Sequence, residues 1–170
     1  AGSFRVPSPI VAGDDGRFVQ RRVDGAAYFT DRGFALSIGG KEGRYGIRAE
    51  LGSGQRVVPR PARRETALVH RYLGARRDEA LPTYGALAWE DAAPGVDMWA
   101  EPADGGFSYA FVVAPGAELS GVSLDWSGVR EVRAEGDRSL RLETGGPTVR
   151  LGGLHAFVLR GSQREELPAR

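Results

Sequence analysis

The feature that most constrains the fold of this chain is a regular alternation of short β-rich runs with glycine-containing turns. The first third of the chain supplies four such runs: Phe18–Arg21, Ala26–Thr30, Phe34–Ile38 and Arg44–Leu51. Steps such as Asp24-Gly25 and Gly39-Gly40 separate them. These steps are hairpin turn signals because glycine and aspartate tolerate a positive φ. An antiparallel meander of four strands is therefore predicted.

The second half of the chain repeats this rhythm at a spacing of about ten residues. Eight further runs are predicted as strands: Ala86–Glu90, Val96–Ala100, Phe107–Val113, Val122–Trp126, Val129–Ala134, Ser139–Glu143, Thr148–Leu151 and Ala156–Leu159. Alternate residues of a strand share a face, so Phe107, Phe111 and Val113 are candidate core residues. Pro94-Gly95 suits the central positions of a type II turn, which would reverse the chain between two of these strands.

This pattern predicts an all-β fold, namely an antiparallel β-sandwich with short turns and at most one short helix. The 25 glycines and 10 prolines argue against long helices. Only residues 64–81 have partial helical spacing, and they are the candidate for that one helix. A length of 170 residues suits one domain, with residues 1–16 as an N-terminal extension and residues 17–170 as a single β-sandwich domain.

Composition excludes several classes of function. The chain has 23 basic and 22 acidic residues, and a net charge of +1 gives no global attraction to nucleic acid or to an anionic membrane. No apolar run approaches the roughly 20 residues that span a bilayer, so direct membrane insertion is not expected. Cysteine is absent, which excludes disulfides, thiol nucleophiles and cysteine zinc sites.

No residue pattern predicts a catalytic or metal site. His70 and His155 are the only histidines, and they lack the spacing of a metal motif. Glu90, Asp91 and Asp97 are the best carboxylate cluster, but an aspartate directly after a Pro-Gly turn commonly accepts backbone N–H bonds. The loops at 13–16 and 104–107 hold aspartates without the full calcium-loop spacing. We therefore predict no catalytic residue, no metal and no cofactor.

Two sets of residues are candidates for contact with a ligand or partner. Trp99 alternates with core-type neighbours and is predicted to be exposed, whereas Trp89 and Trp126 are assigned to the core. Arg60, Arg63 and Arg64 belong to an arginine-rich run at residues 56–77. Their guanidinium groups either pair locally or form a patch for an acidic partner such as a polysaccharide.

Several motifs resemble a known family. Leu81-Pro82-Thr83-Tyr84, the turn from Ala93 to Asp97, the strand from Phe111 to Ala117 and Trp126-Ser127-Gly128 resemble motifs of a β-rich domain of unknown function. That domain precedes SBBP (propeller-type) repeats in large surface and secreted proteins of bacteria. The resemblance covers roughly residues 17–160, and the family's N-terminal signature is replaced here by "FRVPSPIVAGDDG". It implies a secreted or cell-surface location and carries over no catalytic residue.

Three functions follow as expectations. The first is a non-catalytic module of a secreted or cell-envelope bacterial protein, serving adhesion, assembly or presentation of neighbouring domains. Its partners would be neighbouring domains or surface proteins, with acidic polysaccharide as a further candidate. The second is a carbohydrate-binding module, in which exposed aromatic side chains stack against sugar rings. The third is a glycoside hydrolase, which needs two carboxyl groups flanking a cleft.

Overall fold

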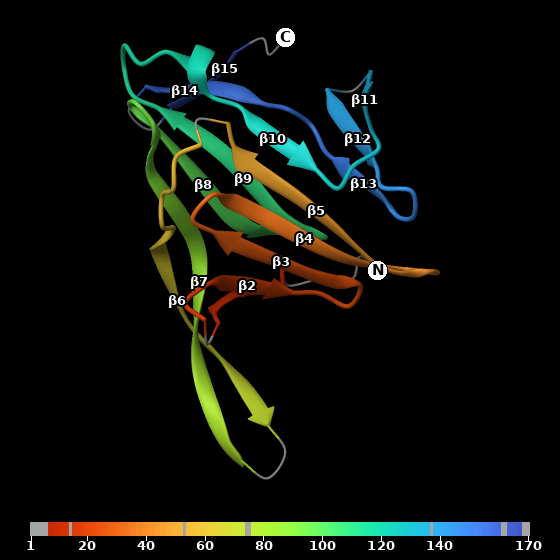
Figure 1. The fold of residues 1–170 in the computed structure, drawn as a ribbon. Coiled ribbons are helices and arrows are strands. Elements are labelled where there is room, and N and C mark those ends of the chain that lie inside the picture. Colours follow the sequence, from red (N-terminus) through yellow and green to blue (C-terminus); the bar gives the residue numbers. More distant parts are fainter. Residues whose placement is uncertain are drawn as a thin grey trace, which may run out of the picture.

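The structure is a computed structural model that describes residues 7–13, 15–52, 54–73, 76–136, 138–160 and 163–167, with side chains of residues 70–79 left undescribed. Antiparallel strands make up nearly all of its regular structure, in one sheet of ten strands and two small sheets (Figure 1). The predicted all-β antiparallel fold is therefore confirmed.

The large sheet runs in the order β10-β5-β4-β3-β2-β1-β7-β8-β9, and β6 pairs with β7. Its strands are β1 (Ile10–Ala12), β2 (Phe18–Arg21), β3 (Gly25–Thr30), β4 (Gly33–Gly40), β5 (Gly43–Leu51), β6 (Arg60–Leu73), β7 (Arg76–Ala93), β8 (Val96–Ala103), β9 (Gly106–Val113) and β10 (Leu124–Ser127). It curls into a half-barrel, as Figure 1 shows. We expected these strands in two packed sheets, but they belong to one continuous hydrogen-bonded sheet, so the sandwich arrangement is not confirmed.

The two small sheets come from the C-terminal part of the chain. β11 (Glu131–Glu135), β12 (Ser139–Glu143) and β13 (Thr148–Leu151) form one, and β14 (Ala156–Arg160) and β15 (Gln163–Leu167) form the other. A 3-10 turn, η1 (Leu119–Gly121), is the helical segment found in the described residues. No helix of the described residues is long and apolar enough to cross a membrane.

An aromatic cluster fills the concave face of the half-barrel and joins its two walls. Phe29 and Phe34, on β3 and β4, contact Phe107 on β9 edge to face, with ring centroids 5.1 and 4.9 Å apart. Tyr109 and Trp126 pack against Phe34. Burial raises the pKa of the Tyr109 phenol, as an apolar environment disfavours its charged form. Rings from strands far apart in sequence thus hold the curl closed.

Trp89 lies at the centre of this core. Its side chain is fully buried, and its indole N–H donates to the Thr30 carbonyl at 2.7 Å, so the ring's polar group is satisfied inside the core. Phe107 and Phe111 pack against the same cluster, as predicted, whereas Val113 is 37% exposed. Trp126 is partly buried against the cluster, in agreement with its assignment to the core.

Residues 10–12 lie within the segment expected as an N-terminal extension, yet they form β1 of the large sheet. β1 pairs with β2 and with β7. Beside it, Gln20 is fully buried, and its amide donates to the carbonyls of Ser8 and Gly106, both at 2.7 Å. This side chain therefore ties the N-terminal segment to the β8–β9 turn.

The helix candidate at residues 64–81 is wrong. Its described backbone lies in β6 and β7, which pair over most of their length with several register shifts. Figure 1 shows this hairpin extending below the half-barrel. The physical reason is that backbone pairing between the two long strands overrides the weak local spacing of Ala67 and Leu68.

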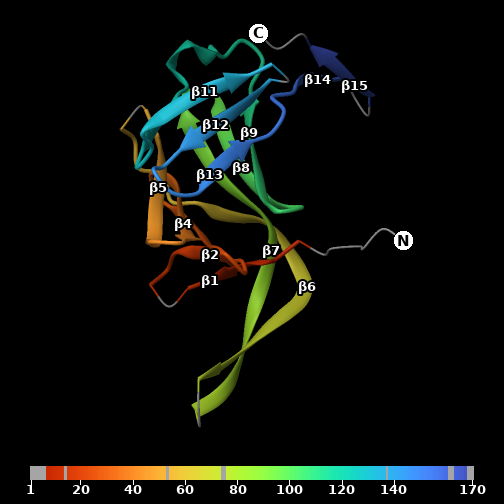
Figure 2. The same cartoon turned by 90° about the vertical axis from the view of Figure 1, so that its right-hand side faces the viewer.

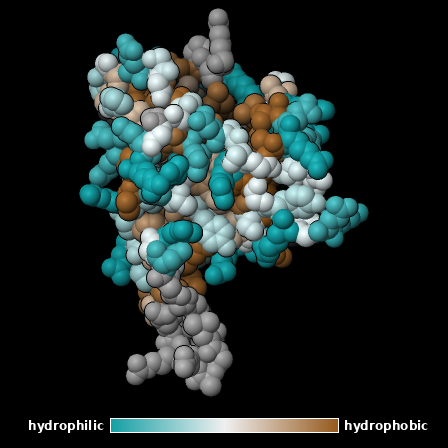
Figure 3. All heavy atoms as spheres, in the orientation of Figure 1, coloured by the Kyte–Doolittle hydropathy of each residue, from teal (hydrophilic) through white to brown (hydrophobic). Residues whose placement is uncertain are grey.

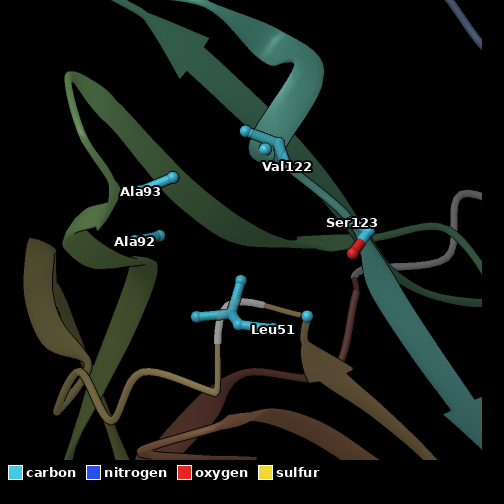
Figure 4. A pocket seen from close by; sticks show the side chains of 7 residues that line it. Leu51, Ala92, Ala93, Val122 and Ser123 are labelled. Carbon is cyan, nitrogen blue, oxygen red and sulfur yellow. The ribbon is translucent and has the colours of Figure 1, made fainter.

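Small side chains pack beneath η1, where strands β5 and β7 of the half-barrel end. Leu51 at the end of β5 and Ala92 and Ala93 at the end of β7 face Val122 and Ser123 (Figure 4). The depression between them holds no volume that a water molecule can enter. It is a packed junction.

Candidate binding surface

The convex face of β6–β9 brings together three of the four candidate contact residues. Arg60 on β6 lies opposite Ala88 on β7, Ala88 lies opposite Trp99 on β8, and Trp99 lies opposite Ala110 on β9. Directly opposed residues share a face, so these four side chains form one row across the sheet, which we call the Trp99 row. Ala88 and Ala110, the two neighbours of Trp99 in this row, are small and therefore do not cover the Trp99 indole from the sides.

Charged side chains border the Trp99 row. Arg60 pairs with Glu90 at 3.5 Å, and Arg63 pairs with Glu65 at 3.3 Å and with Glu101 at 3.7 Å. Arg63 also donates to the Gly85 carbonyl at 2.8 Å. All these ion pairs are exposed, where each contributes about 0–1 kcal/mol. Local pairing thus accounts for much of the charge on Arg60 and Arg63.

Arg64 does not join this row. It lies opposite Tyr84, after a register shift that follows Arg63. The Tyr84 ring packs edge to face against Phe18, with centroids 5.4 Å apart, toward the concave core. The side chains of Arg71, Arg76 and Arg77, which complete the arginine-rich run, lie outside the described residues.

Trp99 is partly buried rather than fully exposed. Its indole nitrogen is buried and has no hydrogen-bond partner in the described part of the chain. The side chain can therefore offer apolar ring surface to a ligand, but its N–H is not available as a donor. Trp99 is suited to stacking and not to polar recognition.

The carboxylates near the Pro94-Gly95 turn are engaged in structural contacts. The Asp91 backbone N–H donates to Asp97 Oδ1 at 2.8 Å, as expected for an aspartate that follows such a turn. Asp91 itself has a positive φ of 52°, and Gly95 has a φ of 70°. The third member of the cluster, Glu90, pairs with Arg60. The expectation that this cluster has no catalytic role stays a prediction.

No group of three or more histidine, aspartate or glutamate side chains that could hold a metal is found among the described residues. His155 is exposed, and its Nδ1 lies 2.8 Å from Glu166 Oε1. This contact lowers the pKa of the Glu166 carboxyl. The side chain of His70 lies outside the described residues.

A second surface, which the sequence analysis missed, lies on the β14–β15 hairpin. We call the exposed side chains of Phe157, Val158, Leu159 and Leu167 the hairpin apolar surface. Phe157 is 42% and Leu159 is 67% exposed. The hairpin lies apart from the half-barrel in Figure 2, and within the described chain its two strands pair only with each other. Four consecutive apolar residues, Ala156–Leu159, were the sequence signal, because an apolar run without alternation covers both faces of a strand.

Other large apolar side chains are exposed on separate parts of the described chain, among them Val23, Val58, Val112 and Leu119. In the orientation of Figure 3, hydrophobic side chains appear as scattered areas between hydrophilic ones. Isolated apolar side chains of this kind are normal on protein surfaces.

One comparison with known proteins gives a match. A family model described as "Domain of unknown function (DUF7948)" matches residues 14–170. No curated protein and no solved structure matches the chain. The match spans nearly the whole chain, from β2 of the half-barrel through both small sheets, and leaves out β1.

Proposed function

The chain belongs to the DUF7948 family of domains of unknown function, and we propose that it is a non-catalytic β-rich module of a larger secreted or cell-envelope bacterial protein. In this proposal the module serves assembly by presenting and supporting a neighbouring domain. The bacterial origin, the envelope location and the place beside propeller-type repeats rest on the motif resemblance at Leu81–Tyr84 and Ala93–Ala117.

The hairpin apolar surface is the observation that carries this proposal. An isolated two-stranded hairpin is at best marginally stable in water. Here Phe157 and Leu159 lie on one face, and Val158 and Leu167 lie on the other, so both faces of the hairpin carry exposed apolar groups. A neighbouring domain that covers one face would remove this surface from water and stabilise the hairpin.

The residues around the apolar side chains fit such an interface. Arg164 lies over the Phe157 ring, 3.8 Å from its centroid, and Arg160 pairs with Glu165 at 3.0 Å. Interfaces commonly have an apolar centre and a charged rim. The hairpin therefore has the composition of a small docking element within a larger assembly.

Limited proteolysis with trypsin tests this proposal, because Arg160 and Arg164 are cleavage sites inside the hairpin. We expect rapid cleavage there in the chain alone and slow cleavage when the chain is part of its larger native protein. The paired change Phe157→Asp/Leu159→Asp should restore rapid cleavage in the larger protein. Val132→Asp is the matched control, because Val132 is a 46% exposed residue of β11. Equal cleavage rates in the two contexts would contradict the proposal.

Carbohydrate binding by the Trp99 row is a second candidate. The observation that favours it is that an indole and two arginines, Arg60 and Arg63, lie on one sheet face. Aromatic rings stack on sugars, and guanidinium groups bind carboxylates. Alginate immobilised on a sensor surface is the probe, measured over a salt series. Trp99→Ala and Arg60→Ala/Arg63→Ala should both weaken binding, with Arg164→Ala as the control, and unchanged binding by both would reject this candidate.

A further inference from the structure

A cavity of about 270 Å³ lies between the half-barrel and the three-stranded sheet. Its walls come from β3 and β4 of the half-barrel, the β8–β9 turn, and β13 of the small sheet. Close-packed protein interiors contain few voids larger than a water molecule. A space of this size at the mouth of a curled sheet is where ligand sites of barrel-like folds commonly lie.

Apolar side chains from both layers face this cavity. Ala27 lies opposite Leu36 in the β3–β4 register, and both belong to the concave face that carries the aromatic cluster. Phe107 extends that cluster to the cavity wall. From the other layer comes Val149, which lies opposite the fully buried Leu142. The apolar face of the small sheet therefore meets the apolar face of the half-barrel across the cavity.

The rim of the cavity is polar, and its side chains are hydrogen-bonded. Arg22 donates from Nε to Asp24 Oδ1 at 3.1 Å and also donates to the Gly105 carbonyl. On the facing strand, Arg150 donates from Nε to Glu135 at 3.0 Å. Thr148 donates to Glu143 at 2.9 Å. Two guanidinium groups from different layers thus lie at the rim, each paired with a carboxylate of its own layer.

β13 adds backbone groups to this rim. It is an edge strand of the small sheet and, within the described chain, pairs with β12 alone. An edge strand presents unpaired N–H and C=O groups. The cavity consequently combines an apolar floor with hydrogen-bonding groups and two guanidinium groups that are paired with Asp24 and Glu135. An apolar lining with a few polar groups is the usual composition of a small-molecule site.

We infer that this cavity binds a small carboxylic acid with an apolar or aromatic body. The body fills the space between Leu36, Phe107 and Val149, and the carboxylate lies at the rim between Arg22 and Arg150. Guanidinium groups bind carboxylates through charge-assisted hydrogen bonds, which are stronger than bonds between neutral groups. Filling the cavity also removes its apolar lining from water. This site is independent of the hairpin apolar surface and of the Trp99 row.

The probe for this inference is 2-naphthoate, with 2-naphthalenemethanol as its neutral analogue. Amide chemical shifts of the ¹⁵N-labelled chain are followed during titration with each compound. We expect saturable shifts at β3, β4, β13 and the β8–β9 turn, with a Kd on the order of 1 mM or tighter, which a ligand of this size reaches at ordinary efficiency. The neutral alcohol should bind about tenfold more weakly, because it lacks the charge-assisted bonds.

Two substitutions fill the cavity from opposite walls. Val149→Trp acts from β13 and Ile38→Trp acts from β4, and each should abolish the shifts while the chain keeps its cooperative thermal transition. Val112→Trp on β9 is the matched control and should leave the Kd unchanged, because Val112 is 52% exposed and does not line the cavity. If one cavity variant fails to fold, the other still provides the test. Arg22→Gln should weaken naphthoate binding about tenfold and leave the alcohol unaffected.

Three results would overturn the inference. The first is the absence of saturable shifts around the cavity. The second is equal binding by the unmodified chain and a folded cavity-filling variant, which would place the probe elsewhere. The third is equal affinity for the acid and the alcohol, which would show that the site does not recognise the carboxylate group.

Discussion

The half-barrel and the β14–β15 hairpin use hydrophobic residues in opposite ways. In the half-barrel, Phe29, Phe34 and Phe107 converge from distant strands and bury one another. In the β14–β15 hairpin, Phe157 and Leu159 stay exposed to water. The two regions are similar in local sequence, with short β-rich runs between glycine turns. Curling of the large sheet, and not composition, decides which apolar side chains are buried.

Exposed ion pairs occur in both regions, and Arg60–Glu90 and Arg63–Glu101 are examples from the half-barrel. The C-terminal strands hold exposed pairs such as Arg133–Glu131 at 2.7 Å, Arg141–Glu135 at 3.0 Å and Arg160–Glu165 at 3.0 Å. Exposed pairs contribute little and are screened by salt. The half-barrel adds a buried apolar core to its exposed pairs, whereas the apolar side chains of the β14–β15 hairpin stay exposed. The hairpin is therefore the part of the molecule whose stability would gain most from a partner.

Truncation of the core should produce the largest effect. Trp89→Ala removes a fully buried ring and its hydrogen bond to Thr30. We expect a loss of about 3–5 kcal/mol in the free energy of unfolding. Urea denaturation followed by tryptophan fluorescence and circular dichroism measures it. A loss below about 1 kcal/mol would mean that the aromatic cluster does not hold the half-barrel together.

A buried polar link should give the next largest effect. Gln20→Met removes the two N–H bonds to the carbonyls of Ser8 and Gly106 and leaves these acceptors without a side-chain donor. The expected cost is about 1–3 kcal/mol. Gln163→Met on the exposed β15 is the matched control and should change the stability by less than about 0.5 kcal/mol. Equal losses of unfolding free energy for Gln20→Met and Gln163→Met would show that the half-barrel and the hairpin do not differ in this respect.

A carboxylate shared by two arginines tests the C-terminal strands themselves. Glu135 accepts from Arg150 and pairs with Arg141, both at 3.0 Å. Glu135→Gln should lower the unfolding free energy by about 1 kcal/mol or less, and 1 M NaCl should shrink the difference. Chemical denaturation at low and high salt provides the comparison. A difference that does not respond to salt would show that packing, and not charge, dominates this sheet.

The exposed hairpin should respond least to truncation. Phe157→Ala removes a ring that is 42% exposed and contacts Arg164. In the chain alone we expect a change within about 0.5 kcal/mol, in contrast to Trp89→Ala. Thermal unfolding of both variants in one buffer makes the comparison. A large loss at Phe157 would show that the hairpin is already packed against the rest of the chain.

The smallest expected effect is a shifted titration at the hairpin. The His155 hydrogen bond lowers the pKa of the Glu166 carboxyl below its usual range. A depressed folded-state pKa means that this contact stabilises the folded state above the unfolded pKa and is lost as the pH falls through the folded pKa. NMR titration should show Glu166 with a lowered midpoint that returns toward the usual value in His155→Ala. An unchanged Glu166 midpoint in that variant would show that the His155 contact does not lower the pKa of Glu166.

The sequence predicted the local strands well because each is marked by its own turn chemistry. Phe34–Ile38 and Phe107–Val113, for example, lie within β4 and β9. Three features depend on contacts between remote segments, which local sequence patterns do not predict. They are the pairing of β1 with β7, the β6–β7 hairpin in place of a helix, and the curl that brings Phe34 against Phe107. Backbone pairing and ring packing between remote segments decide all three.

The candidate contact residues divide in the same way. Trp99, Arg60 and Arg63 meet because strand register places them on one face, whereas register separates Arg64 from them. The sequence marked these residue types as unusual, but local alternation did not predict the register shifts between β6 and β7. The cavity between Arg22 and Arg150 was missed for a related reason, since its walls come from segments more than 100 residues apart in the chain.

Amide hydrogen exchange on the chain alone tests the central contrast most directly. It reports, strand by strand, the free energy of local opening. We expect protection on the order of 10³ or more in β3, β4 and β8, which surround the aromatic cluster, and nearly free exchange in β14 and β15. Protection of the hairpin equal to that of β3 and β4 would contradict this expectation, because the hairpin would then need no neighbouring domain to be stable.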